Sequence, residues 1–472
     1  MKNTVKFILF AAAACLMIFG LSCLFRSRAC TISSLYEVEN DSVQVFVVGG
    51  SHVNAGFIPN LLWENYQISS ENVYSWNQPI WAAYYYLQEG LRTQSPDVVV
   101  LDVFAMCYGR SYIAPDAMVR DTYSSAFTIR PGLPLYGMAV ANQRVDAEHE
   151  LSDYINLFRY HTRWKELFSK DYFYNSYRDY GISTLHGYGI STAKIETESI
   201  SDFTFVDWSE EPYSYCAEYL EKIVELSQKR GFELVLVSLP YNYEATEKEV
   251  LNWVEEYAEN KGLPFLNYNG KDRDRIGFDP AEDLQDKGHL NYYGAAKVTL
   301  DIGAFLSEHY RFTEISESAK ESRSADSARF NRIEKENFVM LSQERAPEFI
   351  REAVNDELYQ LVLFIGDAET LGTGTAAFLQ AAGIDVCDRT AVFIDYDGSI
   401  RAESAGDGYE TVVGGYRFYV RDGSVLSNER EVCAPGTNAA VLYDALISRP
   451  VEYALVHEDG LEHTEFTLRF WG

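Results

Sequence analysis

Between positions 43 and 310, short apolar runs alternate with amphipathic segments, and this alternation constrains the fold more than any other feature. The runs VQVFVVGG, PDVVVLDVF and ELVLVSLP are expected to be buried strands, and PFLNY a shorter one. Amphipathic stretches such as FIPNLLWENY and YCAEYLEKIVELSQKRGF, which stops at Gly231, are expected to be helices. Continuous apolar strands separated by helices indicate an α/β domain, in which a parallel sheet is covered by helices on both faces.

The rest of the chain divides by composition, and a length of 472 residues suggests two or three domains. The strand–helix rhythm fails at about 111–205, which is rich in Tyr, Arg and Ser. We interpret it as a largely helical insertion over the strand ends. Residues 311–347 are charged and Ser-rich, and are expected to be a linker or a solvated helix. Residues 348–472 hold Asp-Gly pairs at 397–398, 422–423 and 459–460, each between alternating runs, which predicts hairpins in a separate, smaller β-rich (α+β) domain.

The N-terminal residues 1–30 are expected to be a membrane anchor or a signal segment. Phe7 to Phe25 is a run of 19 uncharged residues, close to the roughly 20 that cross a bilayer. The flanking charges are nearly balanced, but a long following domain is translocated largely regardless of them. We therefore expect a single-pass protein of the cell membrane with an extracytoplasmic body. A cleaved signal peptide is the alternative, and a lipoprotein on Cys23 is disfavoured because Gly20 stands where a bulky aliphatic residue is expected.

Charge and cysteine content exclude several classes of partner. Lys and Arg number 40 against 70 Asp and Glu, a formal charge of −30, which argues against nucleic acid or anionic lipid as the main partner. No cysteine or histidine spacing suggests zinc, so no metal site and no cofactor are expected. Cys387 and Cys433 could pair in an oxidising compartment, which the sequence leaves open. The lone His161 in the expected insertion is interpreted as a surface or interface residue.

Two motifs at opposite ends of the α/β region carry the candidate chemistry. Ser51 directly follows the first expected strand, after Gly49 and Gly50, which allow a sharp turn and leave space around the hydroxyl. A serine at the carboxyl end of a parallel strand lies where α/β folds place their sites. In DLQDKGHLNYYG, Asp286 and His289 are three residues apart, so the carboxylate can hydrogen-bond to the imidazole. Asp orients the imidazole, His takes the serine proton and Ser attacks in such a triad.

This combination resembles the SGNH, or GDSL-type, hydrolase superfamily over residues 43–310. HLNYYGAAKVT is similar to the end block of its anchored bacterial acyltransferases and esterases. The resemblance implies an SGNH-type three-layer α/β/α fold, with Ser51 as nucleophile, His289 as base and Asp286 as its orienting partner. In that family the oxyanion is held by the serine N–H, a glycine N–H and an asparagine side chain. The block VYSWNQPIW lacks that glycine where it is expected, and the block LDVFAMCYGR lacks that asparagine. Asn77 or the N–H of Gln78 is therefore expected to substitute. Losing one such donor can cost about 10²–10³ in rate.

The resemblance implies a serine esterase or O-acyltransferase that acts on a glycan or another acylated polymer of the cell surface. Water or a sugar hydroxyl then resolves the acyl-enzyme, and the sequence does not choose between them. The alternative is a catalytically degenerate SGNH fold that binds glycan or assembles surface machinery. The C-terminal stretches EYALVHEDGLEHTEFTLRFWG and GTNAAVLYDA resemble the interleukin-like EMT inducer domain. That second resemblance implies carbohydrate binding or a surface-protein partner rather than chemistry.

Overall fold

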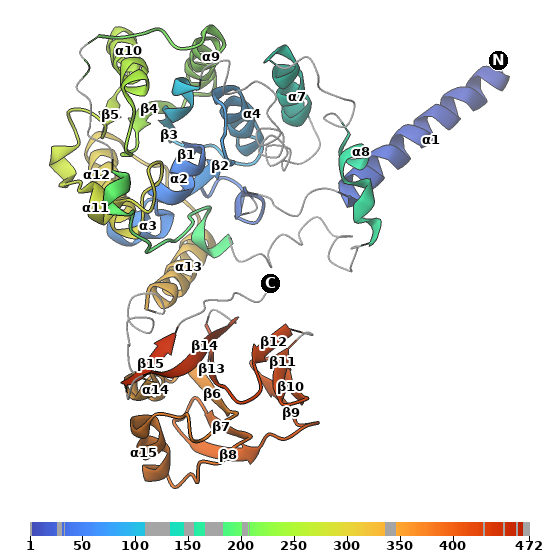
Figure 1. Ribbon diagram of the computed structural model, residues 1–472. Helices are drawn as coiled ribbons and strands as arrows, with labels where there is room; N and C mark the ends of the chain where they lie inside the picture. The colour runs from blue at the N-terminus through green and yellow to red at the C-terminus, as the bar shows by residue number, and fades with distance from the viewer. Residues whose placement is uncertain are drawn as a thin grey trace. The chain divides into compact units, whose positions relative to one another are not determined.

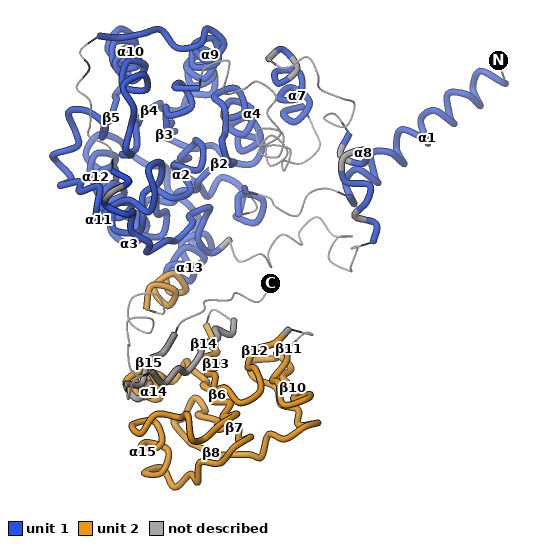
Figure 2. The backbone as a smooth tube through the Cα atoms, in the orientation of Figure 1, with its two compact units in different colours: residues 1–327 blue, residues 328–472 orange. Residues whose placement is uncertain are grey.

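The computed structural model describes the whole chain except residues 1, 26–30, 33, 109–132, 146–154, 166–182, 201–205, 207, 336–345, 428–429, 447–448, 459–460 and 466–472. The chain forms two compact units, residues 1–327 and 328–472, which are coloured separately in Figure 2. Cys30, much of the expected insertion and the Asp-Gly pair at 459–460 lie outside the described residues.

Unit 1 is built on a five-stranded sheet in which every neighbouring pair is parallel (Figure 1). Its strands are β1 (Val45–Gly49), β2 (Ser70–Tyr74), β3 (Val98–Asp102), β4 (Glu233–Ser238) and β5 (Phe265–Asn267). They lie in the order β2-β1-β3-β4-β5, so the chain reverses its direction of travel across the sheet between β1 and β3. Ligands of open α/β sheets bind outside the carboxyl ends of the strands at such a switch point. The expected α/β class is confirmed.

Helices lie on both faces of this sheet. One face packs against α4 (Ile80–Gly90), α9 (Ser214–Arg230) and α10 (Ala245–Lys261) in a single hydrophobic cluster. The other layer holds α2 (Ser51–Gly56), α3 (Pro59–Tyr66) and α12 (Tyr292–His309), and α12 contacts both α2 and α3. The helix α9 ends where its sequence predicts, at Gly231, and α10 ends at Gly262; the φ values of 81° and 67° at these two positions suit glycine.

The described parts of the expected insertion are α7 (Leu133–Val145), α8 (Asn156–Tyr160), short 3₁₀ turns and irregular backbone. His161 follows α8, is exposed, and contacts the Phe158 carbonyl through Nδ1 at 3.0 Å. The segment 311–347, where a linker or solvated helix was expected, contains α13 (Glu317–Lys335). Several α13 side chains are buried, including Arg323 and Phe330, so this helix is packed and not merely solvated.

Among its described residues, unit 2 contains two antiparallel sheets, the end of α13 and two further helices. The larger sheet has the order β15-β14-β13-β6-β7-β8, and the smaller has the order β12-β11-β10-β9. Their strands are β6 (Tyr359–Ile365), β7 (Thr390–Ile394), β8 (Ile400–Ser404), β9 (Glu410–Val413), β10 (Tyr416–Arg421), β11 (Ser424–Ser427), β12 (Arg430–Cys433), β13 (Asn438–Asp444), β14 (Arg449–Glu458) and β15 (Leu461–Glu465). The larger sheet packs on one face against α14 (Ala346–Val354) and α15 (Thr373–Ala381), and on the other against the smaller sheet.

Alternation along β6 explains why the larger sheet has two apolar faces. Leu361, Leu363 and Ile365 join the helices' core, whereas Val362 and Phe364 join the core shared with the smaller sheet. The predicted hairpin at Asp422–Gly423 connects β10 to β11, with both residues at positive φ. The pair Asp397–Gly398 connects β7 to β8. Cys387 and Cys433 are both free.

The N-terminal helix α1 (Lys2–Leu24) stands apart from the sheet of unit 1 in Figure 1. Within it, Asn3–Leu24 is long and apolar enough to cross a membrane, and no other helix among the described residues has these properties. A membrane anchor and a signal sequence both meet this criterion, so the two alternatives inferred from the sequence remain open.

Candidate active site

The turn after β1 places Ser51 at the switch point of the sheet. β1 ends at Gly49, Gly50 adopts an extended conformation, and Ser51 is the first residue of α2. A Cβ on Gly49 would lie 2.9 Å from Cβ of Asp102, at the end of the neighbouring strand β3. Only a residue without a side chain therefore fits between the two strands at this point.

Ser51, His289 and Asp286 lie in one hydrogen-bonded chain. The Ser51 Oγ is 2.7 Å from Nε2 of His289, and Nδ1 of His289 lies 2.9 Å and 3.0 Å from the two carboxylate oxygens of Asp286. With Nδ1 protonated and donating to the carboxylate, Nε2 is free to accept the serine hydroxyl proton. The structure therefore brings together all three residues that the sequence proposed as a triad, although Ser51 and His289 are 238 positions apart.

A compact loop before α12 holds His289. The Gln285 N–H donates to the His289 carbonyl at 3.0 Å, and Leu284 and Leu290 form an antiparallel bridge. Asn291 is the N-cap of α12, accepting from two helical N–H groups, and its Nδ2 donates to the Glu282 carbonyl at 2.7 Å. Since Asn291 is completely buried, its bonds fix the backbone two residues after His289.

Asp286 is held as a carboxylate. Partial burial by itself raises the pKa of Asp286, but the imidazole of His289 and the N–H groups of Gly288 and His289 lower that pKa below its ordinary value. Its side chain is 57% exposed and that of His289 is 30% exposed. Both side chains are therefore partly accessible to solvent.

His52 also belongs to the site, although its sequence context did not predict this. This side chain is buried, stacks on Phe104 with ring centroids 3.8 Å apart, and lies edge to face against Tyr241 and His289. Burial, and then the nearby charge of His289, lower the pKa of His52 to about 3. His52 is thus a neutral ring at working pH. Its one sequence signal is its place directly after the candidate nucleophile.

Asp102 lies behind the serine turn at the end of β3 and is also buried. Burial raises the pKa of Asp102 to about 7, although the N–H groups of Leu239 and Phe104 oppose that shift. Its Oδ1 has no hydrogen-bond partner among the described residues. A carboxyl group in this position is protonated more readily than an exposed one.

The two candidates for oxyanion binding differ in position. Asn77 is exposed at φ +48° and has no hydrogen bond to Ser51 among the described contacts. The Gln78 side chain is buried, and its amide satisfies both ends when Nε2 donates to the Gly49 carbonyl at 2.7 Å and Oε1 accepts from the Ser75 N–H at 3.1 Å. The backbone nitrogen of Gln78 lies 3.5 Å from where a Cβ on Gly50 would stand. The backbone nitrogen of Gln78 therefore lies beside the serine turn, whereas its side-chain amide is occupied by Gly49 and Ser75.

Among the described residues, no group of three His, Cys, Asp or Glu side chains is arranged to hold a metal ion. No family profile matches the sequence, and no curated protein matches it. A crystal structure of an acetyl xylan esterase aligns with this chain at 11% identity, over 56% of this chain and 100% of its own length, with a TM-score of 0.29. A likeness this low supports no conclusion about activity.

Proposed function

We propose that this chain is an extracytoplasmic serine esterase or O-acyltransferase that acts on an acylated cell-surface glycan through Ser51. The observation that carries the proposal is the hydrogen-bonded chain from Ser51 through His289 to Asp286 at the carboxyl edge of a parallel sheet. A nucleophile, a base and an orienting carboxylate in this order are what acyl transfer requires.

In the proposed reaction, Nε2 of His289 takes the Ser51 proton while Oγ bonds to the carbonyl carbon of the ester. The tetrahedral intermediate collapses as the C–O bond to the leaving alcohol breaks and His289 returns the proton to that alcohol. The acyl group now resides on Ser51. A water molecule or a second hydroxyl attacks it, giving up its proton to His289, and the acid or the new ester leaves as the proton returns to Oγ. The partial exposure of the His289 side chain is compatible with either acceptor.

The backbone N–H groups of Ser51 and Gln78 are the proposed oxyanion donors, since Gln78 N lies beside Gly50. The alternative of a non-catalytic glycan-binding fold is favoured by one observation: among the described residues, no hydrogen bond joins the side chain of Asn77 or Gln78 to Ser51. The apolar helix α1 would hold the protein at the membrane or direct its export. Unit 2 would then bind carbohydrate or a partner protein without chemistry of its own.

A fluorophosphonate probe tests this function, because it labels only a serine whose hydroxyl is activated. Full-length protein is expected to be labelled, with the phosphonate on Ser51 by peptide mapping. Ser51→Ala and His289→Ala are expected to remain unlabelled while keeping the far-ultraviolet spectrum of the wild type. An unlabelled wild-type protein that binds glycan would instead establish the binding-protein alternative.

A further inference from the structure

Residues 186–195, which we call the clasp, contact in turn β2, the helix that carries Ser51 and the loop that carries His289. The clasp follows the 3₁₀ turn Ser183–Leu185 and has no regular secondary structure of its own. A segment that makes consecutive contacts with both halves of a catalytic site can set the distance between them.

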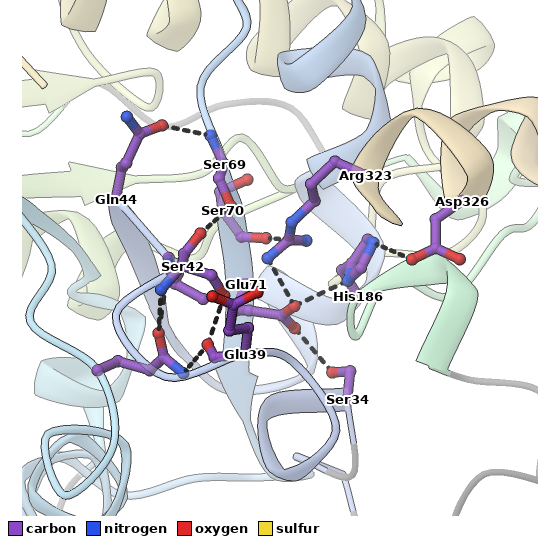
Figure 3. Close-up of polar contacts among 12 residues, drawn as sticks. Ser34, Glu39, Ser42, Gln44, Ser69, Ser70, Glu71, His186, Arg323 and Asp326 are labelled. Atoms are coloured by element: carbon purple, nitrogen blue, oxygen red, sulfur yellow. Dashed lines mark hydrogen bonds and ion pairs between the residues drawn. The ribbon is translucent and has the colours of Figure 1, made fainter. Parts of the chain in front are cut away.

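The clasp begins at a buried anchor on β2. The His186 carbonyl accepts from the Asn72 N–H at 3.0 Å, and its ring nitrogen Nδ1 is 2.7 Å from Glu71. Figure 3 shows His186 between Glu71 and Asp326, with the Arg323 guanidinium 3.0 Å from the same Glu71 oxygen. His186 and Glu71 are almost completely buried. The first residue of the clasp is therefore fixed by a buried ionic network.

The middle of the clasp is bonded to α2. Nδ2 of Asn54 donates to the Gly187 carbonyl at 2.8 Å, and the Gly189 N–H donates to the Asn54 carbonyl at 2.8 Å. Asn54 lies three residues after Ser51, one turn further along the same short helix. These two bonds tie the nucleophile helix to the clasp.

The far end of the clasp is bonded to the base loop. The Ser191 carbonyl accepts from the Tyr292 N–H at 2.7 Å, and the Ala193 carbonyl accepts from Nδ2 of Asn291 at 3.1 Å. The Ile195 N–H donates to the Leu284 carbonyl at 2.8 Å. These bonds hold both ends of the loop that presents His289.

We propose that the clasp sets the register of Ser51 against His289, and that Asn54 is the positioning residue through which it acts on the nucleophile. This inference rests on the proposed function, since it concerns the same pair of groups. Gly189 is bonded to the Asn54 carbonyl and Ser191 to the Tyr292 N–H, and only Ile190 lies between these two clasp residues. A very short piece of backbone therefore connects α2 to the loop that carries His289. A misplacement of about 1 Å between reacting groups can cost about 10²-fold in rate.

The glycine at position 189 supplies a second way to disturb the contact. A Cβ at Gly189 would lie 2.7 Å from Oδ1 and 3.1 Å from Nδ2 of Asn54. Gly189 is not among the positive-φ glycines, so alanine is sterically compatible with its backbone. Gly189→Ala therefore displaces the Asn54 side chain from Gly187 without removing any polar group.

The test is a double-mutant cycle in the full-length protein, read as the rate of labelling by a fluorophosphonate. Asn54→Ala and Gly189→Ala are each expected to slow labelling by about 10–100-fold. The double variant is expected to be no slower than Asn54→Ala alone, because the added methyl group then has nothing to displace. Multiplicative effects, or rates equal to that of the wild type, would overturn the proposal.

Asn60→Ala is the matched control. Asn60 also donates from its side-chain amide to the backbone just before the clasp, at Thr184, but it lies on α3, which carries no triad residue. Its loss is expected to lower the unfolding temperature and leave the labelling rate unchanged. A fall in rate equal to that of Asn54→Ala would show that any loosening of this segment suffices, and would overturn the role of Asn54.

A readout independent of reactivity separates this inference from the proposed function. In a crystal structure of Asn54→Ala, the distance from Ser51 Oγ to His289 Nε2 is expected to exceed hydrogen-bond reach. An unchanged distance would overturn the positioning role even if the wild type reacts. A wild-type protein that the probe does not label would overturn the function, while the measured distance would still decide the role of the clasp.

Discussion

The ring of His52 lies edge to face against the ring of His289, with centroids 5.4 Å apart and an angle of 69° between the planes. The other side of His52 is stacked on Phe104, which follows β3. The base is therefore supported by a ring that is itself held by the sheet edge.

His52→Ala is expected to lower kcat about tenfold, equal to about 1.4 kcal/mol of transition-state stabilisation, with KM little changed. The reason is that the His289 ring loses its lateral support. His52→Phe is expected to restore most of kcat, because a phenyl ring can make the same stack without a titrating nitrogen. Steady-state kinetics on a small ester would measure both. A phenylalanine variant as slow as the alanine variant would assign the role to the nitrogen atoms instead.

Ser51→Ala is expected to abolish ester cleavage and leave the free energy of unfolding within about 0.5 kcal/mol of the wild type. The hydroxyl contributes a hydrogen bond to a partly exposed imidazole and little to packing. Urea unfolding and product release, measured on the same preparation, would show both results. Residual turnover in this variant would mean that another group carries the reaction.

Asp286→Asn is expected to reduce kcat by about 10³–10⁴-fold, because an amide cannot hold the His289 tautomer that leaves Nε2 free. The lowered pKa of Asp286 also gives a sign for stability. Its ionised form stabilises the fold above its ordinary pKa, and that contribution is lost as the pH falls through the lowered, folded-state pKa. The unfolding free energies of wild type and variant should therefore differ above the ordinary pKa of Asp and become equal below the lowered, folded-state pKa. Acid titrations of both proteins would measure this.

The buried network at β2 predicts a pH-dependent stability. Burial opposes a charge on both His186 and Glu71, and Arg323 further disfavours charge on His186. The attraction of Glu71 nevertheless raises the pKa of His186 above 6.5, and that of Glu71 is lowered below 4.5. The contribution of His186 is therefore fully present below its ordinary pKa and is lost as the pH rises through the raised, folded-state value. Among the described residues, Asp326 and Ser34 also face this pair.

His186→Asn tests this dependence, because asparagine tolerates the positive φ of 50° found at this position. The difference in unfolding free energy between wild type and variant is expected to be larger at about pH 6 than at about pH 9. Urea titrations at the two pH values would measure it. A difference independent of pH would mean that His186 is neutral in the folded state.

Much of unit 1 could be predicted from sequence because its signals are local. The strands β3 and β4 are unbroken apolar runs, and α9 ends at a glycine, so each element is specified by its own residues. The candidate triad could also be proposed from local signals, since Asp286 and His289 lie in one motif and Ser51 follows two glycines. Fold class and candidate nucleophile needed no knowledge of distant contacts.

The strand β2 was not predicted because its sequence, SENVY, contains three polar residues and is not typical of a buried strand. Glu71 is completely enclosed there only because Arg323 and His186 reach it from positions 252 and 115 residues away. Partners this distant in the sequence cannot be inferred from the residues next to Glu71. The same limit applies to Gln78, whose side chain is occupied by the Gly49 carbonyl and the Ser75 N–H.

The β-rich unit is expected to need the end of α13. Arg332 contacts both Asp356 and the fully buried Asp444 at 2.5–2.7 Å. A fragment of residues 328–472 keeps this arginine, whereas one that begins at Pro347, near the boundary drawn from sequence, lacks it. Breaking a buried ion pair on one side costs about 3–5 kcal/mol. In thermal unfolding, the longer fragment should show a cooperative transition at a higher temperature than the shorter one. Neither fragment should react with a fluorophosphonate.

The division between the two units, at Ser327 and Ala328, falls inside one continuous helix. A module bounded by loops can be exchanged between genes at many points, because the junction carries little of the structure. Here, transfer of the β-rich unit to another protein would have to divide the chain inside α13. The new host would then have to supply the missing N-terminal part of that helix. The β-rich unit should therefore be inherited together with the C-terminal part of α13. Fusion proteins in which this unit begins at Pro347 should fold less stably than fusions that include that helical segment.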